Sequence, residues 1–540
     1  MQKTIQRCYA FSTKIVVAAM LALTAATVHA QYTGSYQTIT IKDGVISNHP
    51  GPYYVGGTVA DRWGNVLIVT NAGQLFITNS VWGQGFLGGH ATSSNNTAVV
   101  TGSGSIWSNS GSLYVGTAGG ANNQLTIADG GTVYNAAGTV GYSGANNMAL
   151  ITGTGSVWNA TALTVGNVGV GSRLTISNGG AVVNTGAGTI GNAASASNSM
   201  VLVTGSGSVW RSTGIDFGGG TDGSADSKLT IADGGAVYNS GNIRLGAHGN
   251  TMRNTVLITG AGSVLSNGNF TVSFRSTVGG NQLIVADGGT AYNAAIIVGS
   301  QGTGNQLTIT NGGTVYATST SLADTTATSN NTVLVAGAGS VLTNSGILYV
   351  GSVGVGNQMT IADGGTVYNA AGYIGFTGAA VKSNTVFVSG RGSVWRTTGN
   401  LLVNNAGTGN GLIMSNGGVA SVSGSVVINP TGYITNYVTG IAGGLDMAAG
   451  KTLTPTNMGI FFVAEPTETG PFWGLRWQGT NAVATLRGYT NSGALRIDFT
   501  ALPEYWRKKA SDPIFYDGAN TYIGFNVTHI PVKGTIVSVW

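Results

Sequence analysis

The sequence predicts an all-β protein: a parallel, right-handed β-helix solenoid of about 14 coils with a small C-terminal antiparallel β domain or cap. Two phrases, typified by NQLTIADGGTVY at residues 123–134 and VTGSGSIW at residues 100–107, recur in alternation between about residues 65 and 425. Each phrase contains short runs in which β-branched and aliphatic residues alternate with polar ones, and Gly or Asn separates the runs. Period-two alternation broken by turn residues is typical of β-strands.

The repeating unit is one phrase and not the pair of phrases. Copies of the second phrase begin at Val100, Ile151 and Val203, which are 51 and 52 residues apart. Leu283 and Leu307, in contrast, open two consecutive copies of the first phrase only 24 residues apart, so a single phrase is a complete unit. Three short strands turned at Gly-Gly and Asn-Gly corners make one coil, and 90 glycines disfavour helices. The leucines expected to stack as an interior column are Leu125, Leu174, Leu229, Leu283 and Leu307.

Four segments follow one another along the chain. Residues 1–30 predict a secretory signal peptide, with basic residues Lys3, Arg7 and Lys14 around the start of an apolar run at 15–28. Residues 31–64 predict an N-terminal β cap, residues 65–430 the repeat rod, and residues 431–540 a C-terminal β domain. We expect a secreted or surface-exposed protein with no membrane span in the mature chain.

Composition excludes several classes of function. The single cysteine, Cys8, lies in the signal peptide, so the mature chain has no thiol for disulfides, nucleophilic catalysis or zinc binding. Removing the signal leaves 19 basic against 17 acidic residues, a net charge of +2, and the rod carries only nine basic side chains. Nucleic-acid binding requires a clustered basic face, which is absent. We expect no cofactor.

The two phrases resemble the Gly-rich repeats of bacterial autotransporter passengers and of secreted β-solenoid proteins of Gram-negative bacteria that carry autotransporter-associated strand repeats. The resemblance covers about two thirds of the chain and implies a β-helix at the cell surface or outer membrane. It implies little about activity, since such passengers include adhesins, enzymes and toxins. The 110 residues after the rod are fewer than a translocator needs, so the resemblance extends to the passenger alone and leaves anchoring open.

One repeat position carries Asp or Asn, and two interpretations compete there. A calcium ladder would need charged ligands throughout, and the GGxGxD motif of calcium-binding repeats does not occur. Turn-forming residues explain the exchange of Asp for Asn directly, so we expect corners and no metal site. The residues at this position are Asp129, Asp233, Asp287 and Asp363, replaced by Asn178, Asn311 and Asn416.

Only one neighbourhood of the rod concentrates charge, between about Asp216 and Arg275. Residues one coil apart lie close together, so Asp216 or Asp222 is expected to meet Arg244 or His248. β-Helix polysaccharide lyases and hydrolases use carboxylates and a basic residue in this way. The alternative is a loop with surface ion pairs, which contribute little stability each. We favour the alternative and predict no catalytic residues.

Aromatic residues recur once per coil at what reads as one equivalent position. We favour packing inside the rod or along a seam. The alternative is that they stand outward as a stacking platform for sugar rings, and we interpret the FWGLRW segment in the same way. The candidate stacking residues are Trp107, Trp158, Trp210, Trp395, Trp473 and Trp477, and the alternating tyrosines are Tyr134, Tyr238, Tyr292, Tyr316 and Tyr368.

Three functional hypotheses follow, from different classes. The first is a secreted, non-enzymatic structural or adhesive rod that binds a polysaccharide or a host or neighbouring cell surface through its repetitive face. The second is a β-helix polysaccharide lyase or glycoside hydrolase. The third is a self-assembling extracellular matrix component. The monotony of the rod outside residues 216–275 favours the first over the second, and nothing in the sequence separates adhesion from self-association.

Overall fold

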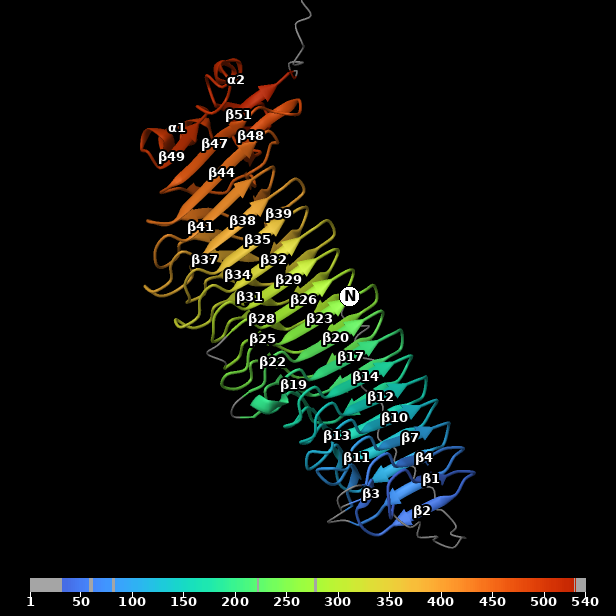
Figure 1. Ribbon diagram of the computed structural model, residues 1–540. Coiled ribbons are helices and arrows are strands. Elements are labelled where there is room, and N and C mark those ends of the chain that lie inside the picture. Colours follow the sequence, from blue (N-terminus) through green and yellow to red (C-terminus); the bar gives the residue numbers. More distant parts are fainter. Residues whose placement is uncertain are drawn as a thin grey trace, which may run out of the picture.

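The computed structural model describes residues 32–57, 62–79, 83–220, 223–275, 279–528 and 530. The predicted signal peptide lies outside these residues and stays a prediction. The described chain winds into a parallel β-helix of about 16 coils, with one short strand per coil on each of three sheets. Figure 1 shows the strands of the first sheet side by side along the rod, with α1 and α2 at its C-terminal end.

The strands of the first sheet pair in parallel, each with its counterpart one coil away. They are β1 (Thr38–Ile41), β4 (Val66–Val69), β7 (Thr97–Thr101), β10 (Gln124–Ala128), β12 (Met148–Thr152), β14 (Arg173–Ser177), β17 (Met200–Thr204), β20 (Lys228–Ala232), β23 (Thr255–Thr259), β26 (Gln282–Ala286), β29 (Gln306–Thr310), β32 (Thr332–Ala336), β35 (Gln358–Ala362), β38 (Thr385–Ser389), β41 (Gly411–Ser415), β44 (Tyr433–Thr439), β47 (Met458–Ala464) and β49 (Leu495–Asp498).

The second sheet follows the first corner of each coil. Its strands are β2 (Ile46–His49), β5 (Gln74–Ile77), β8 (Ile106–Asn109), β11 (Thr132–Val140), β13 (Val157–Val165), β15 (Ala181–Asn184), β18 (Val209–Ser212), β21 (Ala236–Asn239), β24 (Val264–Ser266), β27 (Thr290–Tyr292), β30 (Thr314–Ala317), β33 (Val341–Asn344), β36 (Thr366–Asn369), β39 (Val394–Thr397), β42 (Val419–Val422), β45 (Leu445–Met447) and β48 (Gly470–Gln478).

The third sheet completes each coil, and β11 and β13 are long enough to run through into it. Its other strands are β3 (Tyr53–Val55), β6 (Gly85–Leu87), β9 (Leu113–Val115), β16 (Ala187–Ile190), β19 (Gly214–Phe217), β22 (Ile243–Leu245), β25 (Phe270–Val272), β28 (Ala295–Val298), β31 (Ser319–Leu322), β34 (Ile347–Val350), β37 (Ala371–Ile374), β40 (Leu401–Val403), β43 (Val426–Ile428) and β46 (Leu453–Thr454). A single 3-10 turn, Ala194–Ala196, lies in the loop after β16.

The solenoid prediction is confirmed, but both of its boundaries are wrong. Residues 38–55 do not cap the first coil; they form a coil, because β1, β2 and β3 pair in register with β4, β5 and β6. At the other end, β44, β45 and β46 pair in parallel with the preceding coil, so the rod continues past residue 430. These end coils keep the period-two alternation while lacking the two diagnostic phrases, which is why the sequence predicted about 14 coils.

A short C-terminal cap covers the last coil. It comprises α1 (Val483–Asn491), α2 (Glu504–Lys509), β50 (Ile514–Tyr516) and β51 (Asn520–Val527), and β51 pairs antiparallel with β48 and β50. Phe462 of the last coils packs against Phe499 and Phe525 of the cap, with ring centroids 4.3 and 6.2 Å away. The aromatic side chains of this segment therefore cover the end of the core, as expected of a C-terminal cap.

Inside the rod, large and small side chains alternate from coil to coil. Leu125 of β10 lies in register with Ala98 of β7 and Ala149 of β12, and Leu174 follows next, all of them buried. The predicted leucine column is therefore confirmed. A smaller residue from the other phrase lies between successive leucines, except that Leu283 and Leu307 are in register on adjacent coils. This alternation lets adjacent coils interdigitate at the density of a protein interior.

The tryptophans and tyrosines do not occupy one position, as the sequence suggested; they are one residue out of step. Val133 is level with Trp107 and Trp158, and all three are buried. Tyr134 is level with Ser108 and points outward. The cause is the preceding corner, which has three residues (129–131) in the DGG phrase but four (102–105) in the GSGS phrase.

Three buried indoles of the rod make both a polar and a steric contact with the coil before them. Trp210 Nε1 donates a hydrogen bond to Asn184 Oδ1 at 2.7 Å, and its ring occupies the space where a Cβ of Gly188 would stand, 2.6 Å from Cζ2. Trp158 and Trp395 have the same partners, Asn135 with Gly138 and Asn369 with Gly372. Trp107 covers Gly85, but Ile77 replaces the asparagine and its Nε1 has no partner among the described residues.

Two coils with a smaller residue in place of Trp show the complementary change. Leu265 follows a coil that carries Ile243 at the glycine position, and Leu342 follows one that carries Thr320. A large ring thus lies over glycine, whereas a leucine lies over a coil that carries a branched side chain, Ile243 or Thr320, at that position. The size of each of these interior residues is therefore matched to its neighbour on the preceding coil.

Gly188→Ala should lower the free energy of unfolding by about 1–3 kcal/mol, because the new methyl group overlaps the Trp210 ring. Trp210→Leu should rescue it, so that the double variant is more stable than the sum of the single changes predicts, by ~1 kcal/mol or more. Urea and thermal unfolding measure both effects. Gly51→Ala, where a Cβ meets nothing within 4 Å, is the matched control. Additive changes would show that the two positions are not coupled.

A column of asparagines, which the sequence analysis missed, runs inside the rod immediately before the strands of the first sheet. Asn305 donates its backbone N–H and its Nδ2 to Asn331 Oδ1, both at 3.0 Å, and Asn331 repeats the pattern onto Asn357 at 3.0 Å. All of these side chains are fully buried. The members of the column are Asn65, Asn96, Asn123, Asn147, Ser172, Ser199, Ser227, Asn254, Asn281, Asn305, Asn331, Asn357, Asn384 and Asn410.

A second polar contact accounts for the alternation of the two phrases. Ser156 Oγ of a GSGS corner accepts a hydrogen bond from Gly130 N–H of the preceding DGG corner at 3.0 Å and donates one to Thr152 O at 2.7 Å. Ser208 and Ser393 bind the corners below them in the same way. A DGG corner leaves a backbone N–H that needs a hydrogen-bond acceptor, and the serine hydroxyl of the next GSGS corner provides it. Stacking a GSGS coil on a DGG coil is therefore favourable.

Asn331→Leu should destabilise the rod by about 2–5 kcal/mol, since it leaves two buried donors of Asn305 without an acceptor. Asn331→Ser should cost less, because serine occupies this column at Ser172 and Ser199. Thermal unfolding compares the two, with Asn416→Asp at a corner that tolerates either residue as the neutral control. Equal losses for Leu and Ser would contradict the role assigned to the amide.

Candidate ligand-binding surface

The outward column of the second sheet carries exposed tyrosines, which we call the tyrosine ladder: Tyr134, Tyr238, Tyr292, Tyr316 and Tyr368. Their side chains are 39–47% exposed, in contrast to the buried tryptophans. Each lies on a strand of the rod, so the β-helix itself fixes its direction and its height. Between and beside them in the same column lie Ser108, Asn159, Val183, Arg211, Ser266, Thr343 and Arg396.

The central part of the ladder has a nearly symmetrical order. Tyr292 and Tyr316 lie on adjacent coils as an offset stack, with ring centroids 5.1 Å apart and planes 6° from parallel. At one end Arg211 lies over the Tyr238 ring at 4.9 Å, and at the other Arg396 lies 6.0 Å from the Tyr368 ring centroid. Two guanidinium groups thus flank four rings on one straight column.

At two places in the ladder a coil carries a small hydroxyl residue in place of tyrosine, which leaves a gap between two rings. Ser266 separates Tyr238 from Tyr292, and Thr343 separates Tyr316 from Tyr368. Tyrosines two coils apart stand about 9.6 Å from each other, which leaves room between ring faces for a flat ligand ring. Beside the first gap lies a hollow of about 350 Å³, lined by Arg211, Ser212, Tyr238, Asn239, Ser240 and Ser266. The lining combines a ring face with hydroxyl, amide and guanidinium groups.

Asp216 and Arg244, two of the four candidate catalytic residues, meet as the sequence predicted. They lie on adjacent coils of the third sheet, and the carboxylate accepts hydrogen bonds from Arg244 Nε and Nη2, both at 2.7 Å. This hydrogen-bonded contact raises the pKa of the Arg244 guanidinium, and burial opposes the rise only in part. Arg244 also lies over the Phe274 ring at 5.1 Å. The pair is bidentate and internally satisfied.

The other two candidates are Asp222 and His248. Asp222 lies outside the described residues. His248 is half-buried in the loop after β22, and its backbone oxygen accepts a hydrogen bond from the Thr251 hydroxyl. Asp216 is thus a carboxylate already bound on both oxygens, whereas glycoside hydrolysis uses two carboxyl groups facing one bond.

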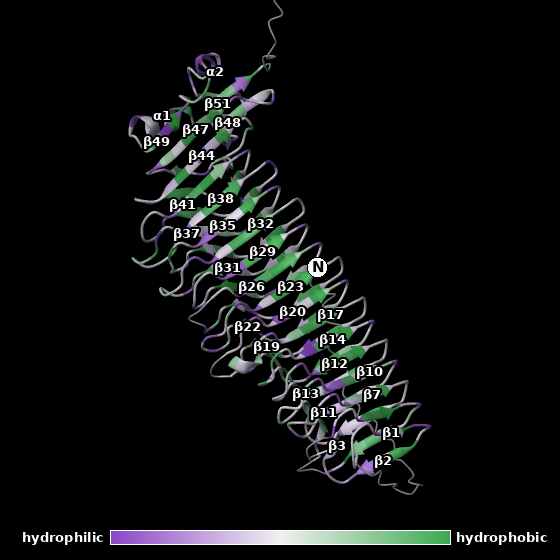
Figure 2. Ribbon diagram, in the orientation of Figure 1, coloured by the Kyte–Doolittle hydropathy of each residue, from purple (hydrophilic) through white to green (hydrophobic). Residues whose placement is uncertain are grey.

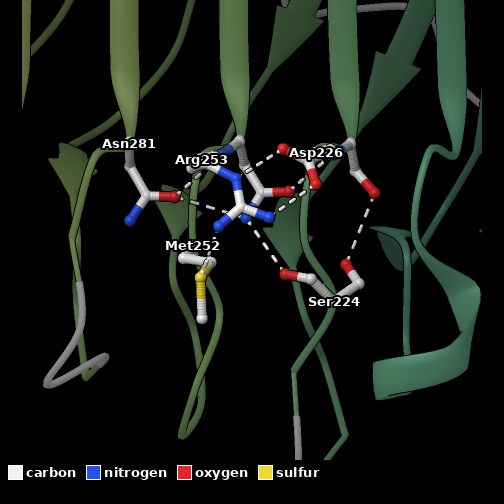
Figure 3. A network of polar contacts seen from close by, with 7 residues as sticks. Ser224, Asp226, Met252, Arg253 and Asn281 are labelled. Atoms are coloured by element: carbon white, nitrogen blue, oxygen red, sulfur yellow. Dashed lines mark hydrogen bonds and ion pairs between the residues drawn. The ribbon is translucent and has the colours of Figure 1, made fainter.

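A second ion pair closes the charged neighbourhood, at the corner before the first sheet. Asp226 accepts hydrogen bonds from Arg253 Nε at 2.8 Å and Nη2 at 2.7 Å, and the side chains are 41% and 56% exposed. Figure 3 shows this pair beside the buried column, to which Asn281 belongs. Both residues have positive φ, 59° and 54°, at a corner position otherwise held mainly by Asn and Gly. The hydrogen bonds from Arg253 lower the pKa of Asp226.

The stability contributed by Asp226 should depend on pH in a defined direction. A depressed folded-state pKa stabilises the rod above the unfolded value of about 3.9 and loses that effect as the pH falls through the folded pKa. Wild type should therefore melt higher than Asp226→Asn at pH 7, and the difference should vanish in acid. Asparagine keeps the positive φ favourable, so the comparison isolates charge. A difference that persists well below the folded pKa would contradict the ion-pair explanation.

The inward packing expected of the tryptophans is confirmed and the stacking alternative is wrong for them, because the structure buries all six indoles. Trp107, Trp158, Trp210 and Trp395 are at most 1% exposed and fill the rod interior. In the FWGLRW segment, Trp477 is 4% exposed and Trp473 is 9% exposed, with Arg476 lying 5.1 Å from the Trp473 ring centroid. Arg476 in turn binds the buried carboxylate of Asp446 through two hydrogen bonds at 2.9 and 2.8 Å. None of these rings presents a face to a ligand.

The turn interpretation of the Asp/Asn position is confirmed by backbone geometry. Asp129 and Asp233 have φ values of 49° and 51°, and Asn178 and Asn311 have 51° and 49°. Asx residues tolerate this left-handed conformation better than other non-glycine residues, so either side chain serves the corner. Within the described residues, no group of three or more His, Cys, Asp or Glu is placed to hold a metal ion.

The third sheet carries two further aromatic groups that the sequence analysis did not single out. Tyr54, Phe86 and Tyr114 stack on successive coils, and Tyr142 meets Tyr114 edge-on at 5.1 Å. A hollow of about 410 Å³ opens beside Phe86, Tyr114 and Tyr142. Farther along, Tyr349 stacks on Tyr373 at 5.5 Å. All of them except Tyr142 are the penultimate residue of a third-sheet strand, a position that can be recognised only once the coil register is known.

No helix among the described residues is long and apolar enough to span a membrane. No family model and no curated relative matches the sequence. A solved structure that is similar to this chain is the crystal structure of a TibC-catalyzed hyper-glycosylated TibA55-350 fragment. The similarity covers 66% of this chain and 97% of that one, at 16% sequence identity and a TM-score of 0.35.

Proposed function

We propose that this protein is a secreted or cell-surface adhesive rod, without enzymatic activity, that binds a polysaccharide through the tyrosine ladder. The observation that carries the proposal is the exposed, rigid column of rings flanked by Arg211 and Arg396. Aromatic faces bind the apolar faces of sugar rings, and tyrosine adds a hydroxyl for sugar hydroxyl groups. The resemblance of the repeats to bacterial passenger domains supports placement outside the cell.

The geometry of the gaps supports a chain ligand over a small molecule. The ladder is straight and open at its sides, and its rings are repeated at multiples of one coil spacing. A chain of sugars lying along the rod would meet several rings at once, so weak contacts would add through multivalency.

Hydrolysis or elimination is the less favoured activity. The third-sheet pair leaves Asp216 bound on both oxygens by Arg244, and Asp226 is bound in the same way by Arg253. A general acid or base must have a proton-accepting atom available to the substrate. These carboxylates instead serve as partners of guanidinium groups.

Purified protein incubated with a panel of polysaccharides should retain at least one of them without releasing soluble fragments. Replacing both Tyr292 and Tyr316 by Ala should weaken that retention by tenfold or more, as loss of a central aromatic contact does elsewhere. Tyr505→Ala, which removes an exposed tyrosine of α2 outside the ladder, is the matched control. Affinity electrophoresis and quantification of reducing ends measure retention and release.

Two outcomes would overturn the proposal. Release of fragments that disappears in Asp216→Asn would establish catalysis at the third sheet. Retention unaffected by the Tyr292 and Tyr316 replacements would place the ligand elsewhere, and Tyr114→Ala would then test the hollow beside Phe86.

A further inference from the structure

The outer face of the first sheet is a flat and almost uncharged surface. From β7 to β41 it comprises thirteen strands, and their only charged residues are Arg173 and Lys228. Figure 2 shows these strands coloured mainly as hydrophobic or neutral. Such a face is unusual beside the second and third sheets, whose outward columns carry ion pairs and arginines.

The central column of this face alternates between aliphatic and threonine side chains. Its members, all half-buried against their neighbours, run Val99, Thr126, Leu150, Thr175, Leu202, Thr230, Leu257, Ile284, Thr308, Leu334, Thr360, Phe387, Ile413. The alternation is broken only where the doubled DGG coil and the β41 coil place two apolar residues side by side. A partner that packs along this whole column needs side chains with the same coil spacing and the same order of apolar and threonine residues. The face of a second copy of this chain has both.

The two long edges of the face have opposite charge. The edge where the strands end carries four carboxylates and Arg391, all within three residues after a strand. The edge where the strands begin carries four basic residues and Asp226, each either the first residue of a strand or within three residues before it. The acidic edge carries Asp129, Asp233, Asp287 and Asp363, and the basic edge carries Arg173, Lys228, Arg253 and Lys382. Turning one copy by half a turn about the rod direction sets the acidic edge of each against the basic edge of the other.

We propose that two copies of this chain pair through the outer faces of their first sheets, side by side and parallel, about a two-fold axis along the rod. At ~4.8 Å per coil and ~3.3 Å per residue, thirteen strands offer about 800 Å² to the partner. This equals the area that each side of a standard stable interface buries. A two-fold contact brings each residue close to its own counterpart, so leucines meet leucines and threonine hydroxyls meet hydroxyls.

The same axis pairs specific charges. Asp233 and Lys228 lie on opposite edges of a single coil, since both flank β20. A two-fold axis along the rod brings Asp233 of one copy to the height of Lys228 of the other. An antiparallel pairing would instead set the acidic edges together, which like charges disfavour.

Sedimentation equilibrium of the full chain should show a dimer at micromolar concentration. Leu202→Lys should raise its dissociation constant at least tenfold, because it buries a charge at the centre of the face. Thr164→Lys, on the outward column of the third sheet, is the matched control and should leave the dimer intact. Circular dichroism and thermal unfolding confirm that each variant remains folded.

A charge exchange tests the orientation. Asp233→Lys should weaken the dimer, and adding Lys228→Asp in the same chain should restore it. A protein that stays monomeric at 100 µM, or a dimer that resists Leu202→Lys, would overturn the proposal. A dimer weakened by Leu202→Lys but not restored by the exchange would overturn the parallel arrangement. Binding of polysaccharide by monomeric Leu202→Lys separates this surface from the tyrosine ladder.

Discussion

Each residue of a coil lies about 4.8 Å above its equivalent in the coil before, and every other feature of the rod depends on this registration. Whatever a position contains, it meets the same position again one step along the axis. Like charges would therefore repel along the whole rod, which explains its low charge. A buried polar group is acceptable only when its neighbour above or below completes its hydrogen bonds, as Asn331 does for Asn305.

Registration also explains how much of the fold the sequence revealed. The alternation around Leu125 predicted strands, an inward column and a coil of about 24 residues, and the structure confirms all three. The Asx corners were equally readable, because Asp129 and Asn178 satisfy one backbone conformation. The ends of the rod were not, since β1 and β44 keep the alternation without the phrases from which the count was made.

The candidate surface was harder to predict for a geometrical reason. One additional residue in the GSGS corner turns Trp107 inward. Tyr134, which aligns with Trp107 when the two phrases are written one above the other, points outward. A shift of one residue along a strand turns every side chain to the opposite face. An aromatic residue at an aligned position of the two phrases therefore cannot be assigned to the inside or the outside until the number of residues in the preceding corner is known. Asp216 and Arg244 were easier, because a separation of one coil alone places them together.

The contact between each buried indole and the glycine before it bears on how such a rod lengthens. Inserting a coil beneath Trp158 or Trp395 would replace Gly138 or Gly372 as the neighbour of the ring, and the ring would fit only if the new coil also carried glycine there. The one duplicated coil, which opens at Leu307, lies between Leu265 and Leu342, in the stretch where leucines take the place of tryptophans. The duplicated coil thus lies where no ring requires a glycine, and a coil added beneath a tryptophan would have to carry glycine at this position.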